Sequence, residues 1–339
     1  MKDLSFEQTA EYLSRFRGEG KKILVTAHVR PDGDALGSVC GLLTLLRENG
    51  FDAWGIRPAT MPDYFCEYLE NEDLFVEEPA GEDLRAYALF ISLDSARKDR
   101  TAADFFSGEE SVFPFPVLNI DHHVDNPAFG DWNLIVPAAA ATAEIVANLA
   151  ACCHWKMTEK AATFLLIGLL TDTGGLRFRN TSPAALRCAA FLEESGGDFD
   201  RVVNSCFFSK PENMARFEAD LLCNHLRKAF DGRFLYAYFE PELLTRYGIE
   251  LRNTEQVIEI LRAISGPVMV ATLRKEDGFF KCSLRSKDPR YSVGRIAREI
   301  GGGGHELAAG CSIRVSVVED ALAILLKHVE KELNEKPSF

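Results

Sequence analysis

From the pattern of its 339 residues, we expect neither a membrane anchor nor a secretion signal. No uninterrupted apolar run approaches the ~20 residues of a membrane-spanning helix. The N-terminal segment MKDLSFEQTAEYLSRF alternates acidic and apolar residues and has no signal-peptide core. The nine cysteines are scattered and include no CxxC pair, which argues against a disulfide framework and for a reducing compartment. We therefore expect a cytoplasmic protein without a membrane segment.

An excess of basic residues is also absent. Lys and Arg number 38 against 51 Asp and Glu, so the net charge is −13, whereas proteins that coat long nucleic acids usually show the opposite balance. Long duplex nucleic acid is therefore not the expected partner. A polyanionic substrate must be met by a local basic patch or by bound cations. The hydrophobic share of 47% and the charged share of 26% are those of a globular protein, and the length suits about two domains.

The first half of the chain alternates strand and helix patterns. Strands are predicted at 23–27, 51–56, 86–94 and from 115 onward. Helices are predicted at 35–49, 141–151, 158–171 and 183–194. Such alternation is typical of an open α/β sheet of parallel strands, and the segment 86–94 is apolar enough to be buried on both faces. We expect the first domain to span residues 1–195.

The second half has a different texture. Strands are predicted at 232–239, at 311–315 and on both sides of a turn at Asp277-Gly278. Helices are predicted at 253–264, with Asn253 as N-cap, at 292–300 and at 318–334. We expect a smaller mixed-sheet α/β domain over 231–339, joined to the first by a helical linker over 196–230.

Acidic and imidazole side chains recur where the buried elements of the first half end. They follow the first, third and fourth predicted strands and close a long apolar helix: His28, Asp32, Asp34, Asp94, Asp121, His122, His123 and Asp172. In open parallel sheets, ligands bind at the carboxyl ends of the strands. Each residue alone has an ordinary alternative as a turn or capping residue. Their joint placement predicts one site.

The residue types in this set narrow the chemistry. Oxygen and imidazole ligands without thiolate suit Mn²⁺ or Mg²⁺. The carboxylates suffice for two ions, with one carboxylate as a bridge. Two metal ions roughly 3.5–4 Å apart clamp the attacking and leaving oxygens of a phosphoryl centre and lower the pKa of a bound water. The pattern therefore predicts hydrolysis of a phosphate ester.

Five motifs carry a resemblance to a known family. In their order, HVRPDGDALGS, SLDSA, DHH and TDTGG resemble the motifs of the DHH phosphoesterase superfamily, and GGGGHELAAG (301–310) resembles the glycine-rich motif of its companion C-terminal domain, DHHA1. The chain is most similar to the subgroup of bacterial oligoribonucleases that also dephosphorylate phosphoadenosine phosphate. The resemblance extends over nearly the whole chain. It implies a homodimer, two Mn²⁺ ions per active site (with Mg²⁺ or Co²⁺ as alternatives) and a cleft between the two domains.

The resemblance also implies roles for the residues at the strand ends. His28 and Asp32 would hold one Mn²⁺ ion, and Asp94 would be shared by both ions. The second ion would be held by Asp34, His122 and Asp172. His123 would face the scissile phosphate, and Asp121 would orient its neighbouring histidine. Arg30 stands where this subgroup often has Asn, which affects substrate contacts more than metal binding.

A second group of candidates concerns substrate binding. Bare backbone N–H groups in a glycine loop can approach a phosphate closely, and four consecutive glycines cost chain entropy that a stability role alone does not explain. Residues 261–300 carry nine basic and four acidic side chains. A flexible helix end and a solvated charged face remain the alternatives. The candidates are Arg285 and Ser286 as phosphate anchor, Gly302, Gly303, Gly304 and His305 of the glycine loop, and Arg100, which follows Asp94 closely.

We expect a Mn²⁺-dependent hydrolase that cleaves short oligoribonucleotides to mononucleotides, with phosphoadenosine phosphate as a further substrate. One alternative is a phosphodiesterase for cyclic or linear di-adenylate. Another is an inorganic pyrophosphatase, which the glycine-rich motif argues against. A non-catalytic nucleotide-binding regulator is the third, and the full ligand set counts against it.

Overall fold

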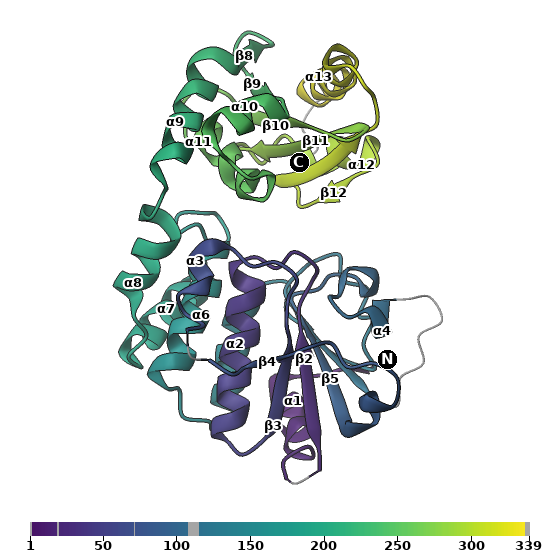
Figure 1. Ribbon diagram of the computed structural model, residues 1–339, viewed down its shortest axis with the longest axis vertical. Coiled ribbons are helices and arrows are strands. Elements are labelled where there is room, and N and C mark those ends of the chain that lie inside the picture. Colours follow the sequence, from purple (N-terminus) through teal and green to yellow (C-terminus); the bar gives the residue numbers. More distant parts are fainter. Residues whose placement is uncertain (1, 19, 71, 108–114, 336–339) are drawn as a thin grey trace. The chain divides into compact units, whose positions relative to one another are not determined.

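The computed structural model describes residues 2–18, 20–70, 72–107 and 115–335. The chain divides into two compact units, Met1–Ser209 and Lys210–Phe339, whose elements are labelled in Figure 1. The division lies inside the segment 196–230. Residues 108–114 of the predicted first domain and 336–339 of the predicted second lie outside the described residues. Over the described part of the chain, no helix is both long and apolar enough to cross a membrane.

The first unit is built on a seven-stranded sheet in the order β1-β7-β6-β5-β2-β3-β4, and every strand pair is parallel. Its strands are β1 (Lys2–Asp3), β2 (Lys22–Thr26), β3 (Asp52–Ile56), β4 (Phe75–Val76), β5 (Tyr87–Leu93), β6 (Val117–Asp121) and β7 (Trp132–Ile135). The predicted parallel α/β sheet is confirmed. The strands that the sequence did not indicate are β1, β4 and β7, which are too short to show a periodic pattern.

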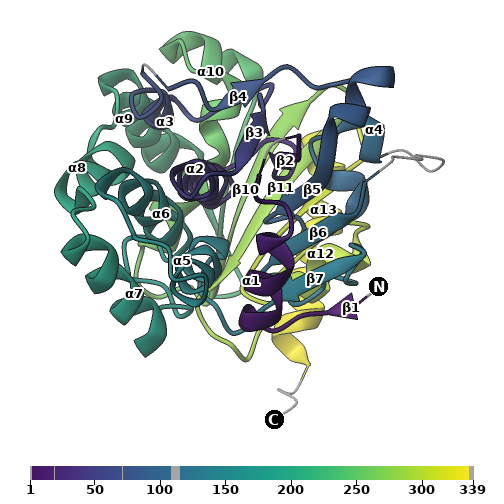
Figure 2. The same ribbon diagram turned by 90° about the horizontal axis from the view of Figure 1, so that it is seen from below.

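The helices of the first unit cover both faces of the sheet. They are α1 (Phe6–Ser14), α2 (Gly33–Glu48), α3 (Asp63–Cys66), α4 (Asp104–Ser107), α5 (Thr142–Cys152), α6 (Glu159–Asp172), α7 (Pro183–Glu194) and α8 (Phe199–Val203). Shorter turns are η1 (Gly81–Ala86), η2 (Lys98–Arg100) and η3 (Asn204–Phe208). Figure 2 shows α2, α5, α6 and α7 on one side of the sheet and α4 on the other.

Successive strand residues point into two different cores. Val25 and Ile91 belong to the core formed with α2, α5 and α6. Their neighbours Leu24 and Phe90 belong to the core on the opposite face, which includes Phe106. Side chains alternate between the two faces of a strand, so a sheet covered on both faces needs apolar residues at every position. This explains why the central strands are continuous apolar runs.

Helices α2 and α6 approach each other closely, and this contact shapes the site. A Cβ atom on Gly37 would lie 2.5 Å from the carbonyl oxygen of Phe164, and one on Gly168 would lie 2.8 Å from Asp34 Oδ1. Glycine is therefore required at both positions, because a side chain there would push the helices apart. The close contact sets the first turn of α2 beside the last turn of α6, which ends at Asp172.

The second unit contains a six-stranded mixed sheet in the order β12-β13-β11-β10-β9-β8. Its strands are β8 (Leu226–Ala229), β9 (Phe234–Phe239), β10 (Met269–Glu276), β11 (Phe279–Ser286), β12 (Gly303–Gly304) and β13 (Ala308–Ile313). Its helices and turns are α9 (Glu212–Asp220), η4 (Leu221–His225), α10 (Pro241–Tyr247), η5 (Leu251–Val257), α11 (Ile258–Arg262), α12 (Val293–Glu299) and α13 (Val318–Asn334). Strands β9 and β10 are parallel and the other pairs are antiparallel. The predicted mixed sheet and the turn at Asp277-Gly278 are confirmed.

The predicted helix at 253–264 is wrong in its first half. Residues Leu251–Val257 form a 3₁₀ helix with Glu250 as its N-cap, and the α-helix begins only at Ile258, so Asn253 lies inside the 3₁₀ helix. The buried side chain of Arg274 explains the difference, because its Nη1 donates to Leu251 O at 3.3 Å and to Thr254 Oγ1 at 2.6 Å. The Thr254 hydroxyl in turn donates to Leu251 O at 2.7 Å. These bonds link Leu251 and Thr254, which are three residues apart as in a 3₁₀ helix. The two bonds from Arg274 come from strand β10.

Candidate metal centre

The acidic and imidazole side chains predicted from the strand ends meet at one edge of the first unit's sheet. Strands β2, β5 and β6 are neighbours in the sheet, so their carboxyl ends lie together. His28 follows β2, Asp94 follows β5, and Asp121 is the last residue of β6. Asp34 lies in the first turn of α2, and Asp172 is the last residue of α6. Sheet order and the contact between α2 and α6 therefore assemble the site.

The described residues contain three groups of potential ligands whose atoms all lie within 4.8 Å of one another: His28–Asp32–Asp94, Asp34–His122–Asp172 and Asp94–His122–His123. In the first group, His28 Nε2 lies 3.9 Å from Asp32 Oδ1 and 3.6 Å from Asp94 Oδ2. Asp94 belongs to two groups and presents a different oxygen to each.

The second group centres on His122. Its Nε2 lies 3.6 Å from Asp94 Oδ1 and 3.7 Å from Asp172 Oδ2. The distance from the same nitrogen to Asp34 Oδ2 is 3.9 Å. His122 Nε2 thus faces three carboxylates at distances too long for direct hydrogen bonds.

These separations suit ligands of a common cation. Two ligand atoms about 2.1 Å from one octahedral ion are about 3 Å apart when adjacent and about 4.2 Å apart when opposite. The separations of 3.6–3.9 Å around His28 and His122 lie inside that range. The oxygen and imidazole donors, with no thiolate among them, are those of a hard divalent ion. The side chains therefore fit one ion at each of two adjacent positions.

The pKa values of Asp34 and Asp172 show that the negative charges of the cluster lie close together and are not compensated. Burial, followed by the charge of Asp94, raises the pKa of Asp34 to about 7. Burial and the charges of Asp34 and Asp32 raise the pKa of Asp172 well above its usual range. A cation bound between such carboxyl groups would stabilise their ionised form.

Asp94 and the histidines respond in the opposite sense to Asp34. Burial opposes ionisation of Asp94, but the nearby imidazole of His28 and the charges of His122 and His123 outweigh it and lower the Asp94 pKa. Burial likewise opposes the charge on His28, but the nearby carboxylates of Asp94 and Asp32 outweigh it and raise the His28 pKa to about 9. Without a metal ion, protons on the histidines supply the positive charge that Asp94 attracts.

Helix α5 holds Asp34 from the opposite side. The carboxylate accepts the backbone N–H of Thr142 at 2.7 Å and that of Ala143 at 2.9 Å. These are the first two N–H groups of the helix, whose N-cap residue Ala141 has no side chain that caps it. A carboxylate at a helix N-terminus satisfies unpaired N–H groups and the helix dipole. Asp34 thus caps α5, and its Oδ2 also lies 3.9 Å from His122 Nε2.

The three histidines are oriented by bonds at Nδ1. Nδ1 of His28 lies 2.8 Å from Val29 O, and Nδ1 of His122 lies 3.4 Å from Ala139 O. A backbone acceptor at Nδ1 fixes the proton there and leaves Nε2 to bind a metal. His123 differs, because its Nδ1 lies 2.8 Å from the buried carboxylate of Asp121. This pairing distinguishes His123 from the two histidines that face the carboxylates through Nε2.

Asp121 is itself held by a network behind the site. Its Oδ1 also accepts the backbone N–H of His122 at 2.8 Å, and its Oδ2 accepts Asn126 Nδ2 at 2.6 Å. Although Asp121 is fully buried, both of its oxygens are satisfied, as a buried carboxylate requires. The network orients His123.

We expect Asp121→Asn to lower kcat about 10- to 100-fold and to leave Mn²⁺ affinity near that of the parent. The amide keeps the shape but replaces one of the two acceptor oxygens with a donor, opposite either His122 and His123 or Asn126, and it removes the charge that favours protonated His123. The kcat–pH profile and a Mn²⁺ titration measure these effects. The control is Asp125→Asn, at an exposed position nearby. A parental kcat with an unchanged pH profile would remove Asp121 from the reaction.

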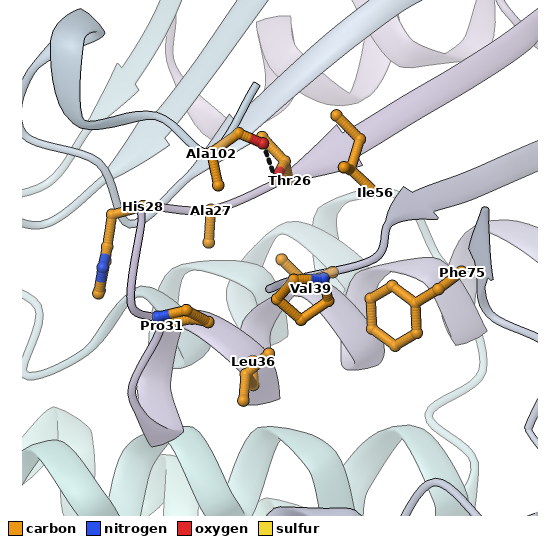
Figure 3. A pocket seen from close by; sticks show the side chains of 10 residues that line it. Thr26, Ala27, His28, Pro31, Leu36, Val39, Ile56, Phe75 and Ala102 are labelled. Carbon is orange, nitrogen blue, oxygen red and sulfur yellow. Dashed lines mark hydrogen bonds between the residues drawn. The ribbon is translucent and has the colours of Figure 1, made fainter. Parts of the chain in front are cut away.

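The turn between β2 and α2 is supported by the segment around residues 100–102. Thr26 Oγ1 donates to Ala102 O at 3.1 Å, and the N–H of Val29 donates to Arg100 O at 2.7 Å. Figure 3 shows His28 at the border of a hollow whose apolar lining includes Leu36 and Val39 of α2, Ile56 of β3 and Phe75 of β4. Its volume of about 10 Å³ is at the lower limit for a single water, so it is a packing gap. The side chain of Arg100 is exposed, and its backbone carbonyl accepts the hydrogen bond from Val29, the neighbour of His28.

Two residues that position these side chains were not indicated by the sequence. Thr142 donates its hydroxyl to Asp94 Oδ1 at 2.9 Å, and Asn126 supports Asp121. In the sequence, Thr142 looks like an ordinary helix-start residue, and Asn126 like a turn residue before proline. Neither has a local signal that points to its carboxylate partner, although Asp121 is only five residues from Asn126, whereas Asp94 is 48 residues from Thr142.

The predicted substrate-binding residues of the second unit cluster around β11 and β13. Arg285 pairs with Ala308 across these strands, and the N–H of Ser286 donates to Leu307 O at 2.9 Å. The side chain of Arg285 already forms an ion pair with Glu259 at 2.8 Å. The buried hydroxyl of Ser286 donates to Asp288 O at 2.7 Å.

The glycines at 301–304 have different structural reasons. Gly301 and Gly304 have φ values of +90° and +127°, which favour glycine. A Cβ atom on Gly302 would lie 2.2 Å from Gly310 O, and the N–H of Gly302 is bonded to Ala297 O at 2.7 Å. At Gly303 a Cβ atom would meet nothing within 4 Å. Backbone conformation therefore explains glycine at positions 301 and 304, and close packing explains it at position 302. Neither reason applies to Gly303, so phosphate binding remains a candidate reason for glycine at this position. Gly303 is exposed, as is His305.

Comparisons with known proteins agree with this architecture. The family model for the DHH family, N-terminal domain, matches residues 22–169, and that for the DHHA1 domain matches residues 231–335. A Thermus thermophilus protein named bifunctional oligoribonuclease and PAP phosphatase NrnA is 33% identical over 324 residues, covering 96% of this chain and 93% of the relative. The Bacillus subtilis protein of that name is 28% identical over 296 residues, covering 86% of this chain and 89% of the relative.

A solved structure shows the same fold. An exopolyphosphatase-related protein from Bacteroides fragilis matches with a TM-score of 0.85 at 22% identity, covering 95% of each chain. The DHH model covers all the clustered side chains of the metal centre except Asp172, and the DHHA1 model covers the glycine-rich segment. The similarity to the Thermus thermophilus relative extends over nearly the full length of both chains. The chain therefore belongs to the DHH family and carries a DHHA1 domain after its DHH N-terminal domain.

Proposed function

We propose that this protein is a metal-dependent phosphoesterase that hydrolyses short oligoribonucleotides to mononucleotides, with phosphoadenosine phosphate as a further substrate. The observation that carries the proposal is the position of Asp94, which presents Oδ2 to His28 and Oδ1 to His122 at 3.6 Å each. Such a carboxylate suits a bridge between two ions. The names of the Thermus thermophilus and Bacillus subtilis relatives support the choice of substrate.

Mn²⁺ is the proposed metal. One ion would be held by His28, Asp32 and Asp94, and the other by Asp34, His122, Asp172 and the shared Asp94. When bound, the two ions supply a water of lowered pKa and positive charge for the oxygens of the phosphate. Mg²⁺ and Co²⁺ offer the same preference for oxygen and nitrogen ligands.

His123 would act on the substrate itself. Its Nδ1 is engaged by Asp121 at 2.8 Å, so we assign Nε2 to the scissile phosphate. Burial opposes protonation of His123, but the hydrogen bond to Asp121 and the charge of Asp94 outweigh it and raise the His123 pKa. A protonated imidazole can donate a hydrogen bond to the phosphate, or a proton to the leaving oxygen.

The second unit would bind the far end of the substrate through Arg285, Ser286, the backbone at Gly302, Gly303 and Gly304, and His305. Arg100 of the first unit would contact the substrate phosphate. The support is chemical, since an arginine and a glycine backbone that a phosphate can approach closely are suited to a phosphate. Glu259 forms ion pairs with both Arg285 at 2.8 Å and Arg262 at 3.0 Å. A phosphate would therefore compete with the Glu259 carboxylate for Arg285.

Substitutions in the second unit test this division of roles. We expect Gly303→Ala, Arg285→Ala and His305→Ala each to lower kcat/KM for a trinucleotide about 10- to 100-fold, the value of a charge-assisted contact to phosphate. Gly303→Ala is the sharpest of the three. It keeps the backbone N–H but adds a methyl group that would prevent the close approach of a phosphate, and because this group meets nothing else within 4 Å, stability should stay near that of the parent. Turnover of bis-p-nitrophenyl phosphate, which offers no far end to bind, should be nearly unchanged.

The measurement is the ratio of kcat/KM for the trinucleotide to that for the small ester, compared between parent and variant. Mn²⁺ affinity is the control and should equal that of the parent. Equal losses on both substrates would place these residues in the chemical step and contradict the proposal.

A substrate panel with Mn²⁺ tests the function as a whole. It comprises a dinucleotide, a pentanucleotide, a longer RNA, phosphoadenosine phosphate, cyclic di-adenylate and pyrophosphate. We expect the highest kcat/KM on the short oligoribonucleotides. A preference for cyclic di-adenylate or pyrophosphate would replace the proposed function, and binding of nucleotides without turnover would indicate a regulator.

We further propose that the protein acts in the cytoplasm as a homodimer. The scattered free cysteines support a reducing compartment, and the dimer follows from the family resemblance. Light scattering of the purified protein measures the assembly, and a monomeric mass would contradict it.

A further inference from the structure

Thr142 is joined to two of the clustered carboxylates at once. Its backbone N–H donates to Asp34 Oδ2 at 2.7 Å, and its hydroxyl donates to Asp94 Oδ1 at 2.9 Å. Asp34 comes from α2 and Asp94 from the end of β5, while Thr142 is the first residue of α5. The residue is fully buried. One side chain with its own backbone thus ties together the two carboxylates that face His122.

The hydroxyl bond determines how Asp94 divides its two oxygens. Oδ1 receives the Thr142 hydroxyl and lies 3.6 Å from His122 Nε2, while Oδ2 lies 3.6 Å from His28 Nε2. Rotation of the carboxylate about its bond to Cβ would break the bond to Thr142. The hydroxyl therefore holds the orientation in which each oxygen faces a different histidine.

Helix stability does not account for this hydroxyl. The first N–H groups of α5 are satisfied by Asp34, and the helix uses no side chain of its own as cap. Two buried threonine hydroxyls at helical positions of this unit bond back to their own helix: Thr44 Oγ1 donates to Cys40 O at 2.8 Å, and Thr173 Oγ1 to Leu169 O at 2.6 Å. Thr142 begins its helix and donates to a carboxylate of another element.

We propose that Thr142 is a positioning residue that couples the two metal sites by holding Asp94 Oδ1 and Asp34 Oδ2 in place. Its hydroxyl sets the affinity of the site formed by Asp34, His122, Asp172 and Asp94 Oδ1. The site formed by His28, Asp32 and Asp94 Oδ2 depends on it less. The inference rests on the proposed function insofar as that function requires two ions.

The test compares Thr142→Val, which removes the hydroxyl at nearly constant shape, with Thr142→Ser, which keeps it. Thr44→Val is the matched control, since it removes another buried helical hydroxyl of the same unit. Free Mn²⁺ is measured by electron paramagnetic resonance during titration of the metal-stripped proteins. Thermal melting of the same metal-free samples separates loss of fold from loss of metal.

We expect two Mn²⁺ ions per chain for the parent, Thr142→Ser and Thr44→Val. For Thr142→Val, one ion should bind nearly as in the parent and the other about 10- to 100-fold more weakly, the usual effect of removing a group that orients a metal ligand. The Mn²⁺ concentration for half-maximal activity should rise by the same factor, with kcat largely restored at saturating Mn²⁺.

Two parental affinities in Thr142→Val, or an equal weakening in Thr142→Ser, would overturn the role of the hydroxyl and leave the proposed function intact. A parent that binds fewer than two Mn²⁺ ions would overturn both.

Discussion

Asp94→Asn should lower kcat/KM for a trinucleotide by about 10³-fold or more, because a shared carboxylate loses its charge toward two ions at once and several kcal/mol of charge stabilisation correspond to such a factor. Asparagine is preferable to alanine here. Asp94 has a φ of +49°, a left-handed conformation that Asp and Asn tolerate better than other side chains. The amide also retains a carbonyl oxygen that can accept the Thr142 hydroxyl.

Asp32→Asn is the matched comparison for a carboxylate that serves one ion. Asp32 is the N-cap of α2 and accepts the N–H groups of Asp34 and Ala35 at 3.1 Å. Asn caps a helix as well as Asp does, so this variant removes a single metal ligand's charge and little else. We expect it to lose less activity than Asp94→Asn. Near-parental turnover of Asp94→Asn at saturating Mn²⁺, measured on protein with a parental melting curve, would refute the bridging role.

Removal of divalent metal should abolish turnover and lower the melting temperature, and the melting loss should grow with pH. The folded-state pKa of Asp34, raised by burial and Asp94 from 3.8 to about 7, means that stability from this group falls as pH rises through that interval. The His28 pKa is raised by its two carboxylate partners, against burial, from 6.5 to about 9. Its charged form stabilises the fold fully below pH 6.5, and this stability is lost as pH rises through 9. Both contributions have the same sign.

Bound Mn²⁺ would supply the charge that these protons provide. At a free concentration 100 times Kd, one ion stabilises the fold by about 2.7 kcal/mol, or about 5–11 °C for a unit of this size. Scanning calorimetry at several pH values between 5.5 and 8.5, with chelator and with Mn²⁺, measures the difference. The gain from Mn²⁺ should be larger at pH 8 than at pH 5.5. Full activity of metal-stripped protein, or a gain that shrinks as pH rises, would contradict the metal centre.

Strands β2, β5 and β6 were predictable because their apolar runs are local. A parallel sheet buried on both faces requires such runs, and the carboxyl ends of its strands meet at one edge. For the same reason the candidate ligands His28, Asp94 and His122 could be selected before any coordinates. The amphipathic helix at 318–334 has equally local signals, and the structure has it over Val318–Asn334.

The errors and omissions arose where partners are distant in sequence. The start of the predicted helix at 253–264 is a 3₁₀ helix, because Arg274 of strand β10 donates hydrogen bonds to Leu251 and Thr254. The left-handed backbone of Asp94 is not encoded in the apolar pattern that precedes it. The explanation of Gly302 is also tertiary, since the residue that excludes a side chain there is Gly310.

By itself, the sequence determined that the chain contains a parallel α/β sheet, a smaller mixed-sheet domain and a set of oxygen and imidazole ligands at strand ends, because these depend on local periodicity and residue chemistry. Only the tertiary structure decided how the ligands are arranged. The contact of α2 with α6 brings Asp34 near Asp172, and α5 delivers Thr142 to Asp34 and Asp94, which lie 108 and 48 positions earlier in the chain. Local pattern cannot specify such pairs, because hydrogen bonds of this range form only after the elements have packed.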